Sequence, residues 1–559
     1  MKRLFILAIS VLSALSAVAQ NGLSERIYLT TDRQVYVAGD MLYCSAFCYD
    51  ALSGDLSDFS SVAYLELHSA TSMVATAKVA LIGGRGGSEF RIPANTPTGN
   101  YVLLAYTAQN CNEDGYDYMT GARTISVFNT SASDRVKDGV EVVPAADYRA
   151  VTATADEGSV VVYAPLAAES GKTANINLSN PGHAAKVSVS VRHDDGIAAP
   201  ATLSGKDFRA SLKPGTSFSS KRIPEFEGEI IRGRVVGLNP AQADSLYGKT
   251  GFISAPGNKS DVYSATIQKD ASITFFTNNI YGDKDLVCEI ENLDPGIPCH
   301  LELESPFVNA AVSGIPTLKM SNALRDPLEK RSAYSSFEHR FAGEMIPEYM
   351  PIRENALFGN EFVQYRLDDY TRFPTMEEVI VEFISEMRLR RNSDRKRDIQ
   401  VRLLDVYNSA RYSNDAALMM IDGIPVFDYE RMLSYDPLLV ESVNIYPYVY
   451  FVGIRSFEGI VNFETYKRNM PAVTFAPNVR IVEFRGCPYP AVYSGLDVSD
   501  NYPDYRQTAY WHPLVEIPEN GEFSFDFMLP QYPGKFVIEV EGFDATGAPI
   551  HIEKPFEVK

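Results

Sequence analysis

The chain has 559 residues, of which 45% are hydrophobic and 22% are charged. This composition is typical of folded globular domains and excludes a largely disordered chain. The length suffices for about three to five domains of about 100–200 residues each. The formal net charge of -20 disfavours nucleic acid as a partner, because phosphate binding needs Lys and Arg gathered on one face.

Residues 1–19 have the pattern of a secretory signal peptide. Lys2 and Arg3 form a basic start, an apolar run extends to Leu15, and residues 17–19 (AVA) supply small side chains for cleavage. The run is shorter than the ~20 residues of a membrane-spanning helix, and no later stretch reaches that length. We therefore expect an exported protein that is peripheral to the membrane, with its signal peptide removed.

Residues 20–130 alternate short β-rich runs with turn signals, which predicts an antiparallel β-sandwich. Three motifs resemble the macroglobulin domain of alpha-2-macroglobulin-like proteins: TDRQVYVAGD at 31–40, GGRGG at 83–87 and PTGNY at 97–101. Many members of that family trap proteases through a Cys-Gly-Glu-Gln thioester, and no Cys here begins that sequence. The resemblance therefore implies a macroglobulin-like domain, with a protease inhibitor that lacks the thioester as the least favoured function.

Two further spans, 158–213 and 226–307, show the period-two alternation of half-buried strands. We expect two separate β-sandwiches, and the second resembles small immunoglobulin-like or carboxypeptidase-regulatory-like domains. Residues 308–357 contain four prolines and have no strong period. They predict an extended connector with one or two short helices.

The chain has six cysteines, which in an exported protein can form disulfides. Cys288 and Cys299 flank a Pro-Gly-Ile-Pro turn and are the best candidate pair. Buried free cysteines are the alternative.

Residues 358–470 hold the most informative pattern. Thr375 and Glu378 form a capping box ahead of an amphipathic helix. Beyond it lie three apolar segments, IDGIPVFD at 421–428, ESVNIY at 441–446 and FEGIVNFET at 457–465. In order and spacing these segments resemble the plug domain of TonB-dependent outer-membrane receptors, which implies a small α+β domain.

The resemblance also gives a role to the turn within this span. We expect Asp422, Gly423 and Pro425 to fix a structural corner of the plug-like domain. About 90 residues follow the domain, whereas the transmembrane barrel of such a receptor needs 22 strands of roughly 10 residues. We therefore expect a plug-like domain without its barrel, in a protein that is not itself the transporter.

A dense basic cluster follows the predicted helix. Its six members are Arg388, Arg390, Arg391, Arg395, Lys396 and Arg397. In an acidic chain such a cluster is a candidate contact for an acidic partner or for lipid phosphates. The alternative is a solvated hairpin between the helix and the next strand.

The last span, 471–559, is again β-rich and predicts a C-terminal β-sandwich. Residues 503–513 contain the only Trp of the chain, Trp511, among aromatic and Arg side chains. This segment resembles a signature of the C-terminal sandwich in exported proteins that bear a plug. Trp, Tyr and Arg dominate binding hot spots, so Trp511 is a candidate contact residue, with a place in the core as the alternative.

No catalytic motif stands out. The seven histidines are scattered, and neither a His-Glu-x-x-His nor a Gly-x-Ser-x-Gly motif occurs. His193, Asp194 and Asp195 come nearest to a metal trio, although the end of a polar strand is the favoured interpretation. We expect no catalytic, cofactor or metal site.

These patterns together predict a mainly β, multidomain protein: tandem antiparallel β-sandwiches plus one small α+β plug-like domain. The favoured function is a non-enzymatic accessory or scaffold protein of the Gram-negative outer membrane, in contact with an outer-membrane protein or complex. A glycan- or peptide-binding module of the periplasm or cell surface is the alternative. Which face of the membrane it serves stays open.

Overall fold

The computed structural model describes residues 23–131, 139–145, 148, 157–238, 244–256, 261–278, 280–291, 293, 297–341, 347–351, 358, 361–391, 397–404, 410–473, 475–495 and 504–559. The expected signal peptide lies outside these residues. The architecture is mainly β, as predicted, and divides into two compact units. Unit 1 comprises Met1–Glu227, Phe307–Pro351 and Cys487–Lys559, and unit 2 comprises Gly228–Pro306 and Ile352–Gly486. Among the described residues, no helix has the length and apolar character needed to cross a membrane.

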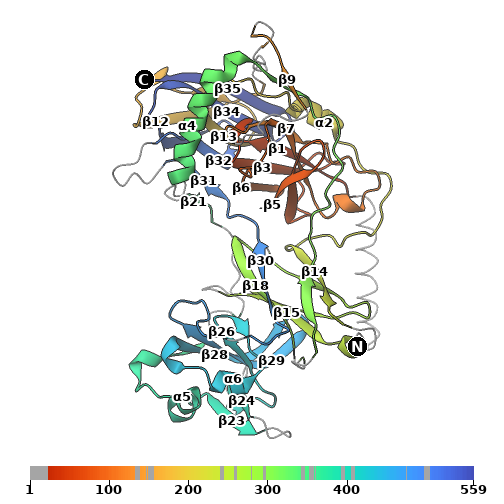
Figure 1. Cartoon of the computed structure of the whole chain (residues 1–559), viewed down its shortest axis with the longest axis vertical. Helices are drawn as coiled ribbons and strands as arrows, with labels where there is room; N and C mark the ends of the chain where they lie inside the picture. Colours follow the sequence, from red (N-terminus) through yellow and green to blue (C-terminus); the bar gives the residue numbers. More distant parts are fainter. Residues whose placement is uncertain are drawn as a thin grey trace. The chain divides into compact units, whose positions relative to one another are not determined.

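The first part of unit 1 is a two-sheet sandwich (Figure 1). One sheet has the order β1-β3-β6: β1 (Glu25–Thr31), β3 (Met41–Asp50) and β6 (Arg85–Arg91). The other has the order β2-β8-β7-β4-β5: β2 (Val35–Val37), β8 (Arg123–Phe128), β7 (Gly99–Tyr106), β4 (Val62–His68) and β5 (Met73–Ala80). Strand β1 is buried along its whole length, because one face joins the sandwich core and Tyr28 on the other bonds Glu541 of a second sandwich, 2.5 Å away.

The second sandwich of unit 1 combines strands from two distant parts of the chain. One sheet has the order β10-β12-β33: β10 (Val161–Tyr163), β12 (Thr173–Asn180) and β33 (Gly521–Met528). The other has the order β11-β35-β34-β13-β32: β11 (Ala167–Ala168), β35 (Pro549–Val558), β34 (Gly534–Asp544), β13 (Ala185–Asp194) and β32 (Thr508–Ile517).

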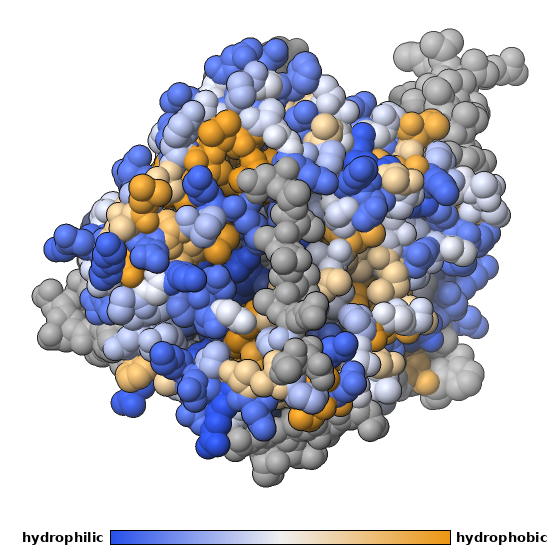
Figure 2. All heavy atoms as spheres, turned by 90° about the horizontal axis from the view of Figure 1, so that it is seen from above, coloured by the Kyte–Doolittle hydropathy of each residue, from blue (hydrophilic) through white to orange (hydrophobic). Residues whose placement is uncertain are grey.

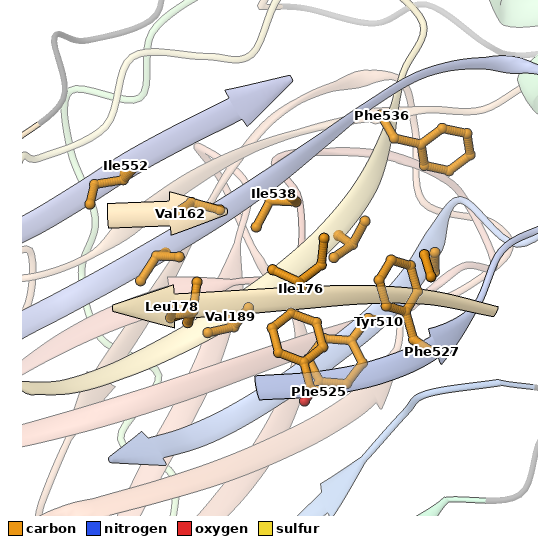
Figure 3. Packing of buried hydrophobic residues seen from close by; sticks show 14 of the residues in the cluster. Val162, Ile176, Leu178, Val189, Tyr510, Phe525, Phe527, Phe536, Ile538 and Ile552 are labelled. Atoms are coloured by element: carbon orange, nitrogen blue, oxygen red, sulfur yellow. The ribbon is translucent and has the colours of Figure 1, made fainter. Parts of the chain in front are cut away.

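This pairing corrects the expectation of separate sandwiches at 158–213 and 471–559. Ile176 on β12 lies opposite Phe525 on β33, and Figure 3 shows side chains of both segments gathered in one core. Neither segment has enough strands to cover its own apolar face, so each completes the other.

Shorter elements surround the two sandwiches. They are the two-stranded sheets β9 (Val140–Val142) with β20 (Leu318–Met320) and β21 (Glu348–Tyr349) with β31 (Ala491–Val492), helix α2 (Gly205–Ser211), helix α4 (Arg325–Phe341) and the 3-10 turns η1 (Asn110–Asn112) and η2 (Asn322–Leu324). The expected connector at 308–357 thus contains a helix of 17 residues, longer than predicted.

Unit 2 begins with a smaller sandwich. One sheet has the order β17-β14-β19: β17 (Ser272–Phe276), β14 (Ile230–Val236) and β19 (His300–Leu303). The other has the order β16-β15-β18-β30: β16 (Asp261–Thr266), β15 (Thr250–Ala255), β18 (Asp283–Ile290) and β30 (Arg480–Arg485). Strand β30 therefore belongs to this sandwich and not to the expected C-terminal one.

The rest of unit 2 is an α+β domain, as expected for 358–470. Its main sheet has the order β22-β28-β29-β26-β27: β22 (Val363–Arg366), β28 (Val440–Val452), β29 (Arg455–Thr465), β26 (Leu418–Ile421) and β27 (Ile424–Pro425). A second sheet holds β23 (Met387–Arg391), β24 (Arg397–Leu404) and β25 (Ala410–Tyr412). The helices are α5 (Met376–Phe383) and α6 (Tyr429–Leu433), and the 3-10 turns are η4 (Leu367–Asp369) and η5 (Pro437–Leu439).

The N-cap Thr375 places the start of helix α5 as the sequence predicts. Thr375 accepts a hydrogen bond from the amide of Glu378 at 3.3 Å, and Met376, Val379 and Ile380 are buried in the domain core. The apolar face of the helix thus covers the sheets, as its periodicity indicated.

Candidate functional site

The turn between β26 and β27 is a two-residue hairpin. Asp422 and Gly423 have φ values of 48° and 84°, and Ile421 pairs with Ile424 on either side. Two successive residues with positive φ define a type I′ turn, which Asp-Gly favours because Gly carries no Cβ and Asp tolerates this region. The motif therefore forms the expected corner.

The Asp422 side chain ties this corner to the end of β29. Its buried carboxylate accepts hydrogen bonds from the Thr465 amide at 2.7 Å, the Thr465 hydroxyl at 2.6 Å and the Met470 amide at 2.8 Å. The Gly423 amide donates to the Asn462 side chain at 3.0 Å, and Pro425 pairs with Met420 in the hairpin. The corner is a rigid, fully bonded part of the domain.

Beside this corner lies a cavity of about 1030 Å³ within unit 2. Its walls come from the end of β18, from β24, from the corner and helix α6, and from residues 472–479. Pro425 and Arg397, two of the residues singled out in the sequence, line it. The cavity is of the size that holds a drug-sized ligand or a short peptide.

Glu289 reaches this cavity from β18. It lies opposite Phe252 of β15 and alternates with Cys288 and Ile290, whose side chains are in the sandwich core. Burial raises the pKa of Glu289 to about 8, against a smaller opposing effect of Arg431. The Glu289 carboxyl has no hydrogen bond or ion pair with any described residue.

Two more polar side chains of the cavity are without partners among the described residues. The side-chain oxygen of Asn478 accepts no hydrogen bond, although Asn478 is only 5% exposed. The Arg431 guanidinium, on α6, makes no ion pair in the described structure. Sequence reasoning missed all three; the one available signal was a charged residue, Glu289, inside the apolar run of β18.

The structure places Arg388, Arg390 and Arg391 of the predicted basic cluster on β23 and Arg397 on β24, and these two strands pair. Arg388 lies 3.9 Å from the centre of the Tyr412 ring and donates to Gln400 at 2.9 Å. Arg397 donates to Glu430 at 2.9 Å and also pairs with Glu377.

Of the remaining four cations, two are exposed and two lie outside the residues that the structure describes. Arg390 and Arg391 are exposed on β23, while Arg395 and Lys396 lie outside the described residues. The described residues show the pairing of β23 with β24 but not the turn between them, and Arg390 and Arg391 are available for contact.

Trp511 is not a surface contact. It is 2% exposed and packs with Tyr43, Ala491 and Tyr493 inside unit 1. The candidate patch is corrected to a core cluster. Strand β32 is the last strand of its sheet, but the backbones of Trp511 and Tyr493 exchange two hydrogen bonds of 2.9 Å, and the side chains around the indole bury it.

Two groups of potential metal ligands are engaged by arginine. Asp195 of the candidate trio pairs with Arg331 at 2.5 Å. The ligand atoms of Glu539, His551 and Glu553 lie within 4.8 Å of one another, but Arg192 donates to Glu539 at 3.1 Å and to Glu553 at 2.8 Å.

The pKa of His551 indicates that Glu539, His551 and Glu553 form an ion-pair network with Arg192. Despite burial, hydrogen bonding to Glu539 and the nearby carboxylates raise the pKa of His551 to about 9. Metal binding requires a deprotonated His, so the protonated ring suits the carboxylates better than it suits a metal.

The six cysteines are all buried in the structure, and none of them forms a disulfide. The candidate Cys288–Cys299 disulfide is therefore not formed. Both residues belong to the core of the unit 2 sandwich, where they pack as small apolar side chains, and burial raises the pKa of the Cys288 thiol to about 12.

Hydrophobic side chains are also exposed on the protein surface. On the face in Figure 2, hydrophobic side chains gather in several patches separated by hydrophilic ones. Large apolar side chains are also exposed in unit 2, among them Phe451 at 76% and Ile454 at 61%. Such patches are common on proteins that bind others.

The fold and site thus define a mainly β, multidomain protein with an α+β domain that carries a cavity. No protein-family model matches the chain, and no curated protein matches it. Among solved structures, an Escherichia coli alpha-2-macroglobulin activated by porcine elastase aligns with 96% of this chain and 44% of its own, at 8% identity and a TM-score of 0.24. The Escherichia coli adhesin FdeC aligns with 49% of this chain and 62% of its own, at 12% identity and a TM-score of 0.16.

This chain spans less than half of the macroglobulin it resembles. Scores this low fix neither an activity nor a partner. The site itself therefore carries the functional argument.

Proposed function

We propose that this chain is an exported, non-enzymatic binding protein that contacts a partner at the Gram-negative outer membrane through the plug-like α+β domain of unit 2. The observation that carries the proposal is the cavity beside the Asp422 corner, in which Glu289, Asn478 and Arg431 are left without partners in the described structure. Asn478 is buried, and Glu289 and Arg431 are half-buried; unpaired polar groups that are shielded from water cost stability. A ligand that pairs with them removes that cost.

The composition of the cavity supports binding. Apolar side chains such as Phe427 and Phe475 alternate with a few charged ones, the mixture typical of sites that hold a ligand by burial and orient it by polar groups. The Asp422 corner supplies a rigid wall, which lowers the entropy lost on binding.

The basic hairpin supports contact with an acidic partner surface. Arg397 lines the cavity, and Arg390 and Arg391 extend the positive charge along β23. Exposed charges of this kind steer association more than they add affinity. The sandwiches of unit 1, which resemble macroglobulin-like domains, would then serve as the spacer that carries the binding domain.

The first prediction tests this proposal through charge reversal. The tagged full-length protein and its Arg390→Glu/Arg391→Glu variant are recovered from membranes solubilised in mild detergent, at low and at high salt. We expect the native protein to retain an outer-membrane protein, identified by mass spectrometry. The variant should retain about 10-fold less at low salt, because exposed charges act over roughly a Debye length of 10 Å at 0.1 M salt.

The matched control reverses two exposed cations of unit 1, Lys319 and Arg325, to Glu. It should retain the partner at the native level. Equal recovery from the native protein and the Arg390/Arg391 variant at every salt concentration, or recovery of no outer-membrane protein, contradicts the proposal.

A further inference from the structure

The charged side chains that line the cavity of unit 2 determine the charge of the ligand that it favours. Five carboxyl-bearing side chains and two arginines line it. One of the arginines, Arg397, is already paired with Glu430. The cavity is therefore net negative and favours a cation.

The unpaired groups show where that cation would bind. Val479 follows Asn478, and Arg480 is the partner of Cys288 in the ladder of β18 and β30. Glu289 follows the last pair of this ladder on one strand and Asn478 lies two residues before it on the other, and both side chains line the cavity. A carboxylate and an amide oxygen are both acceptors, so a ligand group that pairs with either of them must be a donor.

The same face of β18 explains why Glu289 has no partner within the protein. Val287, two residues earlier on this face, packs against Ile424 of the corner and Val479. Val479 of this cluster also lines the cavity. Glu289 comes next on this face of β18, and no described residue forms a hydrogen bond or ion pair with its carboxyl.

Arg431 adds a second requirement for the ligand, a hydrogen-bond acceptor. It lies near enough to Glu289 to act on its charge, yet the two form no ion pair. A guanidinium donates hydrogen bonds and accepts none. The ligand therefore needs an acceptor, such as a backbone carbonyl, a short distance from its cation.

We infer that the cavity binds a short peptide segment of a protein partner, with a Lys or Arg side chain bonded to Glu289 and Asn478 and a backbone carbonyl bonded to Arg431. This inference deepens the proposed function and rests on it. The apolar walls would hold the aliphatic stem of the cationic side chain and its neighbours. A volume of about 1030 Å³ exceeds what a single alkylamine fills, which favours a peptide.

The second prediction uses defined probes. Blocked leucine-lysine-leucine tripeptide, its norleucine counterpart and n-hexylamine are titrated into the full-length protein by calorimetry at pH 8.5. At that pH the lysine is protonated and the Glu289 carboxyl, with its pKa of about 8, is mostly ionised. We expect the lysine tripeptide to bind about 10- to 100-fold more tightly than the norleucine peptide, the range of a hydrogen bond to a charged group.

The protein variants separate the cation site from general apolar binding. Glu289→Gln should bind both tripeptides equally, with the preference for lysine lost. Glu483→Gln, an exposed position on the neighbouring strand β30, should keep the preference. Because Glu289→Gln removes an unpaired carboxyl, it should fold at least as stably as the native protein, which its melting temperature checks.

Each other result has a definite meaning. An unchanged preference in Glu289→Gln, or norleucine binding as tight as lysine, overturns the cation site. Hexylamine binding as tight as the tripeptide overturns the peptide and leaves a small amine as the ligand. Absence of all binding overturns the inference, while partner recovery that depends on Arg390 and Arg391 would still uphold the proposed function.

Discussion

Two buried carboxylates, Glu66 and Asp422, differ in their partners from the half-buried Glu289. Glu66, in unit 1, and Asp422, in unit 2, are fully bonded, whereas Glu289 is bonded to no described residue. A buried charge is tolerated when hydrogen bonds replace water and is costly when they do not. The contrast fits a structural role for Glu66 and Asp422 and the ligand-binding role that we propose for Glu289.

Glu66 shows how a single side chain holds a connecting segment. Its carboxylate accepts from the successive amides of Val308, Asn309 and Ala310 at 3.0, 2.9 and 2.9 Å. Tyr106 donates to it at 2.7 Å. Successive amides that converge in this way form an anion nest, which anchors the start of the 307–351 segment on the first sandwich.

The third prediction concerns Glu66→Gln. Burial alone would raise the pKa of Glu66, but hydrogen bonds from His68, Tyr106 and the backbone amides lower it to about 2. The stabilisation is therefore complete above the unfolded pKa of about 4.3 and is lost as the pH falls toward 2. We expect the variant to lose about 1–3 kcal/mol of unfolding free energy at pH 7, and the difference from the native protein to shrink below pH 4.

Urea unfolding followed by tryptophan fluorescence at pH 7 and pH 3 measures this difference. Glu519→Gln, at an exposed turn of the same unit, serves as the control and should match the native protein at both pH values. A Glu66→Gln deficit of equal size at both pH values would show that shape, not charge, matters at this position.

At the scale of elements, local sequence patterns correctly predicted the features that depend on local sequence alone. The capping box set the start of α5, Asp-Gly set the type I′ corner, and period-two alternation found the strands. The pairing partner of each strand could not be predicted from the sequence, because alternation shows which face of a strand is buried but not which strand lies beside it. Pairing of Ser190 with Trp511 joins residues far apart in sequence, so the two halves of one sandwich were predicted as two.

The length of helix α4 was underestimated for a different reason. The helix attaches to unit 1 through polar groups, so it lacks the apolar stripe that reveals most surface helices. Arg331 donates to Asp195 at 2.5 Å and to the Val35 carbonyl at 2.7 Å, and Tyr334 stacks on Tyr505 with ring centres 4.9 Å apart. The unpaired groups of the cavity, Glu289, Asn478 and Arg431, could not be predicted from the sequence either, because only the folded structure shows that a side chain has no partner.

The fourth prediction tests the attachment of α4. Arg331→Met removes the cation that pairs with Asp195 and the donor to the Val35 carbonyl, and loss of one partner of a buried ion pair costs about 3–5 kcal/mol. We expect faster hydrogen exchange across α4 and a lower melting temperature. Arg325→Met is the control, because its pair with Glu329 is exposed and is worth about 0–1 kcal/mol. Equal effects of the two substitutions would argue against the buried pair as the anchor.

At the scale of the whole molecule, the chain passes repeatedly between the two units. It leaves unit 1 after Glu227, returns for Phe307–Pro351, and returns again for Cys487–Lys559. Each unit has hydrophobic clusters of its own. Units with separate cores open with separate free energies, even when several chain segments join them.

The single tryptophan allows this independence to be measured. Trp511 is buried in unit 1, so its fluorescence reports the unfolding of unit 1, whereas far-UV circular dichroism reports both units. The fifth prediction compares Glu66→Gln, in unit 1, with Asp422→Ala, in unit 2. Asp422→Ala leaves the Thr465 and Met470 amides without their acceptor and places Ala at a φ of 48°, which should cost about 2 kcal/mol or more.

We expect Asp422→Ala to shift part of the circular dichroism transition to lower denaturant and to leave the fluorescence transition in place. Glu66→Gln should shift the fluorescence transition. If both substitutions move both signals by the same amount, the units unfold together and the passages of the chain between them couple their stability. With independent units, the lysine tripeptide should stabilise only the transition that Trp511 does not report, because ligand binding stabilises the unit that folds to form its site.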